Sequence, residues 1–102
     1  MRTLMFHLDV YNDIQEGYSW YEEKSPGLGK DFIAELETSY VAIEKMPETW
    51  PLLTKRIHRY ILKRFPYGVL YIIRNEVIIE VIAVMHLKRN PGYWNDRVNH
   101  RR

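Results

Sequence analysis

Hydrophobic and polar residues follow two different periods in two regions of the 102-residue chain. Residues 3–8 alternate as in a strand, with Leu4, Phe6 and Leu8 on one face. Spacings of three and four residues then predict two helices, at about 10–24 and from about 26 or 28 to 46. Alternation returns afterwards and predicts three further strands, at about 56–65, 68–74 and 77–87.

Each predicted helix has one apolar stripe, and acidic residues occupy much of the rest of its surface. The stripe of the first is Val10, Ile14, Gly17 and Tyr21, and that of the second is Leu28, Phe32, Leu36, Tyr40 and Ile43. Asp9 is expected to cap the first helix and Ser25 the second. The carboxylates are interpreted as an acidic outer surface, Asp13 and Glu35 included. The short connection between the helices predicts a helical hairpin.

The last predicted strand, 77–87, is apolar on both faces, which indicates a central strand covered on both sides. Its polar residues Glu80, His86 and Lys88 have the same parity, so we expect them on one side of the sheet. The 56–65 pattern does not show which face is buried, and a bulge could exchange its faces midway. Asn75-Glu76 is expected to form a tight turn with Asn75 at positive φ.

These elements predict an α+β fold: an N-terminal strand, a two-helix hairpin, and antiparallel strands forming a small twisted sheet. We expect one domain over residues 1–94 and a polar, flexible tail over 95–102. The chain has no cysteine, which excludes disulfides, thiolate metal sites and cysteine nucleophiles. No apolar run has the roughly 18 residues of a membrane span, and the N-terminus is unlike a signal peptide, so a soluble intracellular protein is expected.

Charge divides the chain into two halves. Residues 1–54 hold four Lys/Arg against ten Asp/Glu, a net −6, and residues 55–102 hold eleven against three, a net +8. This asymmetry favours a polyanion or an acidic protein as partner of the basic half. The structural alternative is that the basic side chains only keep a small sheet soluble.

An ordered set of short motifs covers nearly the whole chain and resembles the RelE/ParE superfamily of bacterial toxins, most closely its plasmid stabilisation branch. The motifs are Tyr21 within WYEE, Gly27-Leu28-Gly29, Pro47, Trp50-Pro51, Leu62-Lys63-Arg64-Phe65-Pro66-Tyr67-Gly68 with Tyr71, and Ala83-Val84-Met85-His86 followed by Lys88-Arg89-Asn90-Pro91 and Trp94. The resemblance implies the toxin of a type II toxin–antitoxin pair, silenced by a cognate antitoxin. It implies either ribosome-dependent mRNA cleavage, as in RelE-like members, or poisoning of DNA gyrase, as in ParE-like members. A degenerate, non-toxic module that binds protein or nucleic acid is the competing hypothesis.

The candidate site for the ribonuclease hypothesis follows from the chemistry of metal-independent RNA cleavage. Histidine can act as acid or base, fixed cations can stabilise the phosphorane, and an aromatic can stack a base. The candidate catalytic residues are His86, Arg64, Lys88 and Arg89, and the candidate substrate-binding residues are Lys63, Tyr67 and Tyr93. In the structural alternative, His86 holds the tail, the cations solubilise the strand end, and Trp94 folds back over the hydrophobic edge.

The resemblance also implies an antitoxin that wraps an extended or helical segment around the toxin. The basic face that includes Arg56 and Arg59 suits such a segment, particularly an acidic one. No metal site is predicted, since His7, His58, His86 and His100 lack ligand spacing. No cofactor is expected either, because the sequence has no Gly-rich phosphate loop.

Overall fold

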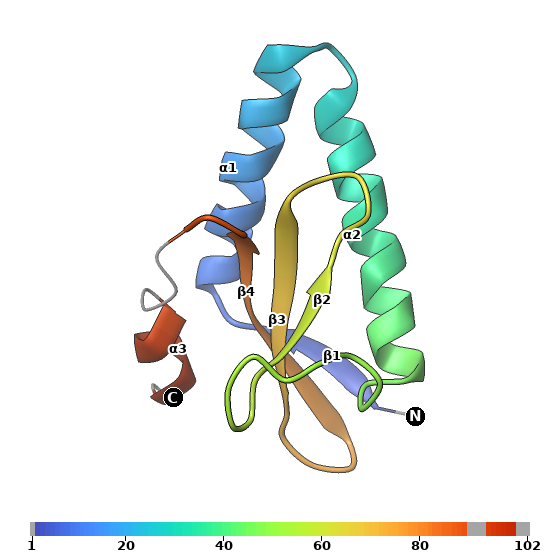
Figure 1. Cartoon of the computed structure of the whole chain (residues 1–102), viewed down its shortest axis with the longest axis vertical. Helices are drawn as coiled ribbons and strands as arrows, with labels where there is room; N and C mark the ends of the chain where they lie inside the picture. The colour runs from blue at the N-terminus through green and yellow to red at the C-terminus, as the bar shows by residue number, and fades with distance from the viewer. Residues whose placement is uncertain (1, 90–93, 100–102) are drawn as a thin grey trace.

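A four-stranded sheet carries a helical hairpin on one face (Figure 1). The computed structural model describes residues 2–89 and 94–99. The elements are β1 (Thr3–Phe6), α1 (Asp9–Lys24), α2 (Leu28–Lys45), β2 (His58–Ile61), β3 (Tyr67–Ile73), β4 (Ile78–His86) and α3 (Asn95–Asn99). The strand order is β1-β4-β3-β2. The predicted α+β class is confirmed. β1 runs parallel to β4, whereas β4, β3 and β2 pair antiparallel as expected.

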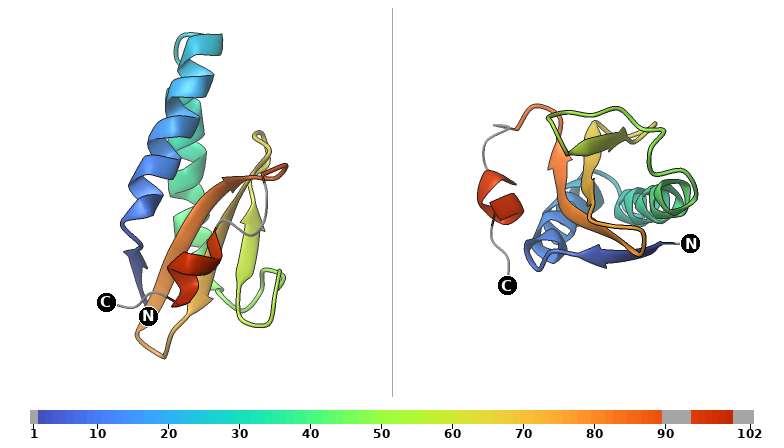
Figure 2. Two further views of the ribbon diagram at one scale, coloured as in Figure 1. Left: turned by 90° about the vertical axis from the view of Figure 1, so that its left-hand side faces the viewer. Right: turned by 90° about the horizontal axis from the view of Figure 1, so that it is seen from below.

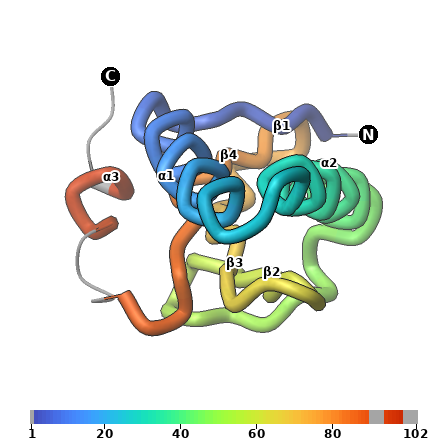
Figure 3. The backbone as a smooth tube through the Cα atoms, turned by 90° about the horizontal axis from the view of Figure 1, so that it is seen from above, coloured from blue at the N-terminus to red at the C-terminus, as the bar shows by residue number. Residues whose placement is uncertain are grey.

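The hairpin of α1 and α2 lies over one face of the sheet (Figures 2 and 3). It packs on the sheet through residues of the predicted apolar stripes. Phe32, Leu36 and Val10 are fully or almost fully buried there. We call this the helix-side core; its buried members are Val10, Phe32, Leu36, Ile43, Tyr60, Leu62, Phe65, Val69, Tyr71, Ile79, Val81 and Val84. No helix in the described part of the chain is long and apolar enough to cross a membrane.

The opposite face of the sheet is buried as well, as the doubly apolar pattern of the last strand predicts. We call this the outer core; its buried members are Ile57, Leu70, Ile72, Ile82, Ala83, Met85 and Trp94. Leu53 and Val98 pack against it from the loop before β2 and from α3. Residues 95–99, expected within a flexible tail, instead form α3. Trp94 folds back over the sheet, as the structural alternative proposed, and is 5% exposed.

A β-bulge in β4 exchanges the faces of the strand midway. Leu70 pairs with Ala83 and Tyr71 with Val81, so Ile82 is the extra residue. Ile82 and Ala83 accordingly both face the outer core. The prediction that Glu80 and His86 share a face is therefore wrong. Glu80 pairs with Ile72 of the outer core, whereas His86 pairs with Tyr67, which packs on the helix side.

The ends of the helices differ from the predicted caps. Asp9 is the first residue of α1 and makes no side-chain cap, because the helix begins one residue earlier than expected. Ser25 ends α1 instead of capping α2. The α2 N-terminus is held by Glu22, whose carboxylate accepts from the Gly27 N–H at 2.9 Å and the Gly29 N–H at 3.0 Å. A carboxylate there also suits the positive end of the helix dipole.

The turn between β3 and β4 is formed by a side chain. Among the described residues, no residue other than glycine has a positive φ, so the expected left-handed Asn75 is wrong. The Asn75 side-chain oxygen instead accepts from the Val77 N–H at 2.7 Å and the Ile78 N–H at 2.9 Å. An asparagine side chain can close a turn in this way without leaving the common backbone region.

Candidate functional site

Two loops meet at the end of the sheet beside α1. We call Tyr67, His86, Lys88 and Arg89 the His86 cluster. Tyr67 and His86 are paired across β3 and β4, with ring centroids 5.2 Å apart in an edge contact. The Lys88 backbone N–H donates to His86 Nδ1 at 3.1 Å, and the Arg89 N–H donates to the His86 carbonyl at 3.0 Å. The structure thus brings four of the predicted site residues together.

The hydrogen bond to His86 restricts what its ring can do chemically. Because Nδ1 accepts from the Lys88 amide, the neutral ring carries its proton on Nε2. Action as a general base requires a lone pair on Nε2, and action as an acid requires the doubly protonated ring. Both states place a proton on Nδ1, so both lose this hydrogen bond. The local geometry therefore favours a ring that donates one hydrogen bond outward.

Tyr67 belongs to an aromatic cluster under the helical hairpin. Its ring centroid lies 4.9 Å from that of Phe32 and 6.1 Å from that of Tyr21. Burial, followed by the nearby Tyr21 and Glu16, raises the pKa of the Tyr67 phenol. The ring is half-buried, and several of its edges are already in contact with protein. Stacking of a base on Tyr67 remains a prediction.

Lys63 and Arg64 lie in the loop between β2 and β3. This loop lies beside α2 (Figure 1). Their backbone N–H groups donate to the carboxylate of Glu35. Glu35 therefore anchors this loop from a partly exposed position, a role that its interpretation as solvated surface did not include. The Arg64 guanidinium lies 3.5 Å from Asp31 and over the ring of Phe65 at 5.2 Å.

Carboxylates thus face both arginines of the predicted catalytic set. Arg64 pairs with Asp31 on α2, and Arg89 lies 4.0 Å from Glu16 on α1. All four side chains are about half exposed or more. Exposed pairs of this kind are weak, yet they offset part of each arginine's charge. The two arginines are held by different helices.

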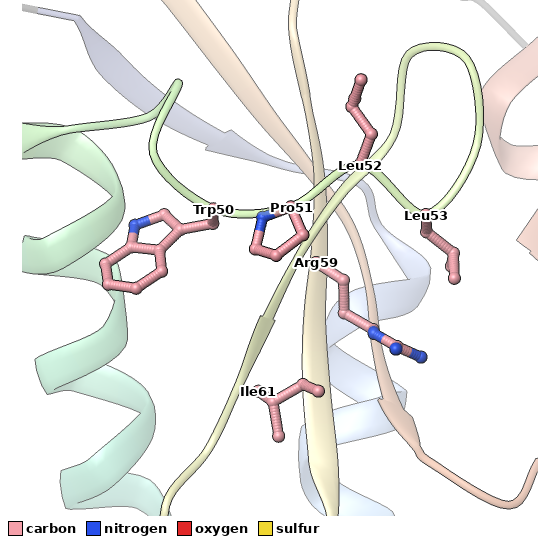
Figure 4. A pocket seen from close by; sticks show the side chains of 6 residues that line it. All are labelled: Trp50, Pro51, Leu52, Leu53, Arg59 and Ile61. Atoms are coloured by element: carbon pink, nitrogen blue, oxygen red, sulfur yellow. The ribbon is translucent and has the colours of Figure 1, made fainter.

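Arg59 lies on β2 and lines a groove of about 290 Å³ (Figure 4). The other lining residues are Trp50, Pro51, Leu52, Leu53 and Ile61. Arg56 is exposed in the loop that precedes β2. Tyr93, predicted to bind substrate, lies outside the described residues. Within the described part of the chain, no three His, Asp or Glu side chains are grouped closely enough to hold a metal.

The most constrained ion pair was missed by the sequence interpretation. Asp13 is 7% exposed, so its assignment to the outer surface is wrong. It receives two hydrogen bonds from Arg97, at 2.7 and 3.1 Å, and one from the Val84 N–H at 2.9 Å. Arg97 also donates to the Ile82 carbonyl at 2.9 Å. The available signal was that Asp13 lies three residues after Val10 and so falls on the buried stripe.

The comparisons with known proteins first define the class of fold. The chain is similar to a solved structure described as "Chromosomal ParDE TA system from P. aeruginosa". The TM-score is 0.68 at 12% sequence identity, over 86% of this chain and 98% of that one. At this identity the likeness shows a shared fold.

A family model then gives the family. The model described as "ParE toxin of type II toxin-antitoxin system, parDE" matches residues 4–91. The chain belongs to the ParE toxin family. A search of curated proteins found no match.

Proposed function

We propose that this chain is the toxin of a type II toxin–antitoxin module of the plasmid stabilisation kind. It acts in the cytoplasm, is neutralised by a cognate antitoxin, and inhibits growth by poisoning DNA gyrase. Membership of the ParE toxin family supports the toxin role. The choice of gyrase over mRNA as the target rests on the geometry of the candidate catalytic residues.

The observation that carries this choice is the hydrogen bond from the Lys88 N–H to His86 Nδ1. A ribonuclease of the predicted type needs His86 to exchange a proton, and each exchange breaks that bond. The pairing of Arg64 with Asp31 adds to the argument, because a phosphate clamp works best with an unshared guanidinium. A protein that binds its target and performs no chemistry needs none of these proton transfers.

Charge supports neutralisation by a partner protein. Residues 55–102 carry a net +8, and Arg56 and Arg59 lie on or next to the β2 edge of the sheet. An antitoxin with an acidic binding segment would be drawn to this edge. Cognate neutralisation is tested by expressing the chain from an inducible promoter, with and without the short reading frame beside it. We expect growth to stop without the neighbour and to continue with it.

The target is tested with purified protein in two parallel assays. We expect loss of gyrase supercoiling with accumulation of cleaved DNA, and no new mRNA ends in a translating ribosome system. The ribonuclease mechanism would be established instead if the parent produced new mRNA ends and His86→Ala or Arg64→Ala produced roughly tenfold fewer of them or less. Both variants should retain the parent's circular dichroism. Unchanged growth on induction would leave the non-toxic binding module as the function.

A further inference from the structure

The segment that leads into β2 folds back on itself and stands out from the sheet. We call residues 51–59 the Lys55 loop. Three backbone contacts close it: the antiparallel bridge between Leu52 and His58, the 2.9 Å bond from the Arg59 N–H to the Pro51 carbonyl, and the 2.6 Å bond from the Leu53 N–H to the Ile57 carbonyl. The loop lies at the end of the molecule away from the connection between α1 and α2 (Figures 1 and 2). Its tip, residues 54–56, has the sequence Thr-Lys-Arg.

Side chains fix the base of the Lys55 loop to the domain. Nδ1 of His58 lies 2.6 Å from the Trp50 carbonyl, and because a carbonyl can only accept, Nδ1 is the donor. The His58 ring also stacks on Tyr71, with 5.1 Å between the ring centroids and 11° between the ring planes. Leu53 and Ile57 pack in the outer core. The tip is therefore held by a fixed base, so a ligand that binds there pays little for ordering the backbone.

The Lys55 loop carries three cations. Lys55 and Arg56 are exposed at its tip, and Arg59 is half-buried where the loop enters β2. None of the three forms an ion pair within the residues that the structure describes. The neighbouring sequence supplies no counter-charge either, because no Asp or Glu occurs from residue 49 to residue 75. This surface therefore carries positive charge that the described residues do not compensate.

Other arginines of the sheet and its loops lie beside carboxylates. Arg64 is 3.5 Å from Asp31, and Arg74 is 2.6 Å from Glu80. Such pairs lower the local positive potential even where they add little to stability. A polyanion that approaches the basic half of the chain therefore meets the least opposing charge at the Lys55 loop.

The residue types of the loop favour the backbone of a duplex over other polyanions. Single-stranded nucleic acids are bound largely by stacking their bases on aromatic side chains, and residues 51–59 include no Phe, Tyr or Trp. Lysine, arginine and threonine are instead typical donors to phosphate oxygens, and Thr54 is exposed beside the two cations of the tip. Duplex DNA presents one charge per about 1.7 Å of its axis. An extended acidic peptide presents at most one per about 3.3 Å.

We propose that the Lys55 loop binds the phosphate backbone of double-stranded DNA. Lys55 and Arg56 contact phosphates at the tip, Thr54 donates to a neighbouring phosphate oxygen, and Arg59 adds a contact from β2. Because these contacts go to the backbone, binding does not depend on the base sequence. The use of this site, to hold the DNA on which gyrase acts, rests on the function proposed above; the binding of DNA itself does not.

The probe is a fluorescent DNA duplex of about two helical turns, or roughly 20 base pairs, whose binding is followed by anisotropy. The association constant is measured over about 50–200 mM salt, where the loss of released counterions is largest. Three phosphate contacts predict that its logarithm falls with the logarithm of the salt concentration with a slope of at least about 2.7 in magnitude. Two duplexes of unrelated sequence should bind equally, and a single strand of the same length should bind more weakly.

The protein variants are Lys55→Gln and Arg56→Gln, with Lys30→Gln as the matched control. All three lower the net charge by the same amount, and Lys30 is exposed on α2, outside the Lys55 loop. We expect each tip variant to reduce the magnitude of the salt slope by about 0.9 and to weaken binding about tenfold at 50 mM salt, since one phosphate contact is lost. Lys30→Gln should keep the parent's slope and bind within about twofold, as expected for a distant screened charge. Circular dichroism should be unchanged in all three.

Three results would overturn the proposal. These are equal weakening by Lys30→Gln and Arg56→Gln, binding of the single strand as tightly as the duplex, and displacement of the duplex by an oligoglutamate at an equal concentration of charges. The last result would assign the loop to an acidic protein. Gyrase poisoning that survives in a protein without DNA binding would remove the DNA site and leave the toxin function standing. Binding of DNA through the Lys55 loop without any effect of the parent on gyrase would do the reverse.

Discussion

The substitution Arg97→Met tests whether the buried ion pair fastens α3 to the rest of the molecule. Methionine keeps most of the length of the arginine side chain and removes its charge and donors. In the parent, the Arg97 guanidinium donates twice to Asp13 and once to the Ile82 carbonyl. After the substitution, Asp13 would keep only the Val84 N–H among the donors that the structure describes.

The magnitude follows from the burial of the pair. Asp13 is 7% exposed and Arg97 is 9% exposed, so little water can replace the lost donors. Removing one partner of such a pair costs about 3–5 kcal/mol. Small domains have total unfolding free energies of about 5–15 kcal/mol. With about 4–8 °C of Tm lost per kcal/mol, we expect the Tm to fall by more than roughly 12 °C.

The assays are thermal unfolding for the Tm and urea unfolding for the free energy. Both are followed by circular dichroism and tryptophan fluorescence, with Arg64→Met as the matched control. Arg64 also faces a carboxylate, but both side chains are more than half exposed. Such a pair contributes about 0–1 kcal/mol. Adding Asp13→Asn to Arg97→Met removes the stranded charge and should recover at least half of the loss. A loss below about 1 kcal/mol for Arg97→Met would refute the assignment of α3 as a fastened element.

Two further substitutions test other features of the fold. Glu22→Ala removes the side chain that caps α2 through the Gly27 and Gly29 amides, so we expect a loss of about 1 kcal/mol in thermal unfolding; an unchanged Tm would contradict the capping role. For Tyr40, burial first and then Glu37 raise the pKa to about 12 from 10.0. Its raised pKa adds stability that is complete below pH 10 and is lost as the pH approaches 12, so Tyr40→Phe should be less sensitive than the parent to pH between 10 and 12 in urea titrations. The buried hydroxyl has no partner in the described part of the chain, so Phe should cost little at pH 7. Equal alkaline sensitivity of the two proteins would contradict this account.

Periodicity predicted the elements of the fold because each buried face repeats along one short segment. The stripe of α2 is an example: Phe32, Leu36 and Ile43 are all buried as the spacing indicates. The bulge at Ile82 escaped prediction since it depends on which residues of β3 lie opposite β4. In a run of residues that is apolar on both faces, the sequence does not show where odd- and even-numbered residues exchange faces of the sheet. One extra residue therefore placed Glu80 and His86 on opposite faces.

The candidate site was predicted in part, for a related physical reason. Tyr67, His86, Lys88 and Arg89 meet because they occupy adjacent strand ends, which the order of elements makes foreseeable. The partners of Arg64 and Arg97 come from other elements, and nothing near either arginine in the sequence identifies those partners. Glu35 is similar: its bonds to the Lys63 and Arg64 amides join residues nearly thirty positions apart. A side chain that binds the backbone of a residue distant in the sequence leaves no periodic pattern of hydrophobic and polar residues.

The contrast between an acidic first half and a basic second half is therefore partly satisfied within the molecule. Asp13, Glu16 and Asp31 on the hairpin face Arg97, Arg89 and Arg64 respectively. These pairs link the acidic helices to the basic second half of the chain, so a net +8 overstates the charge available to a partner. Within the described residues, Lys55, Arg56 and Arg59 face no carboxylate, and they lie on or just before one strand. The positive charge available to a partner is thus concentrated at and just before the β2 edge of the sheet, not spread over half of the chain.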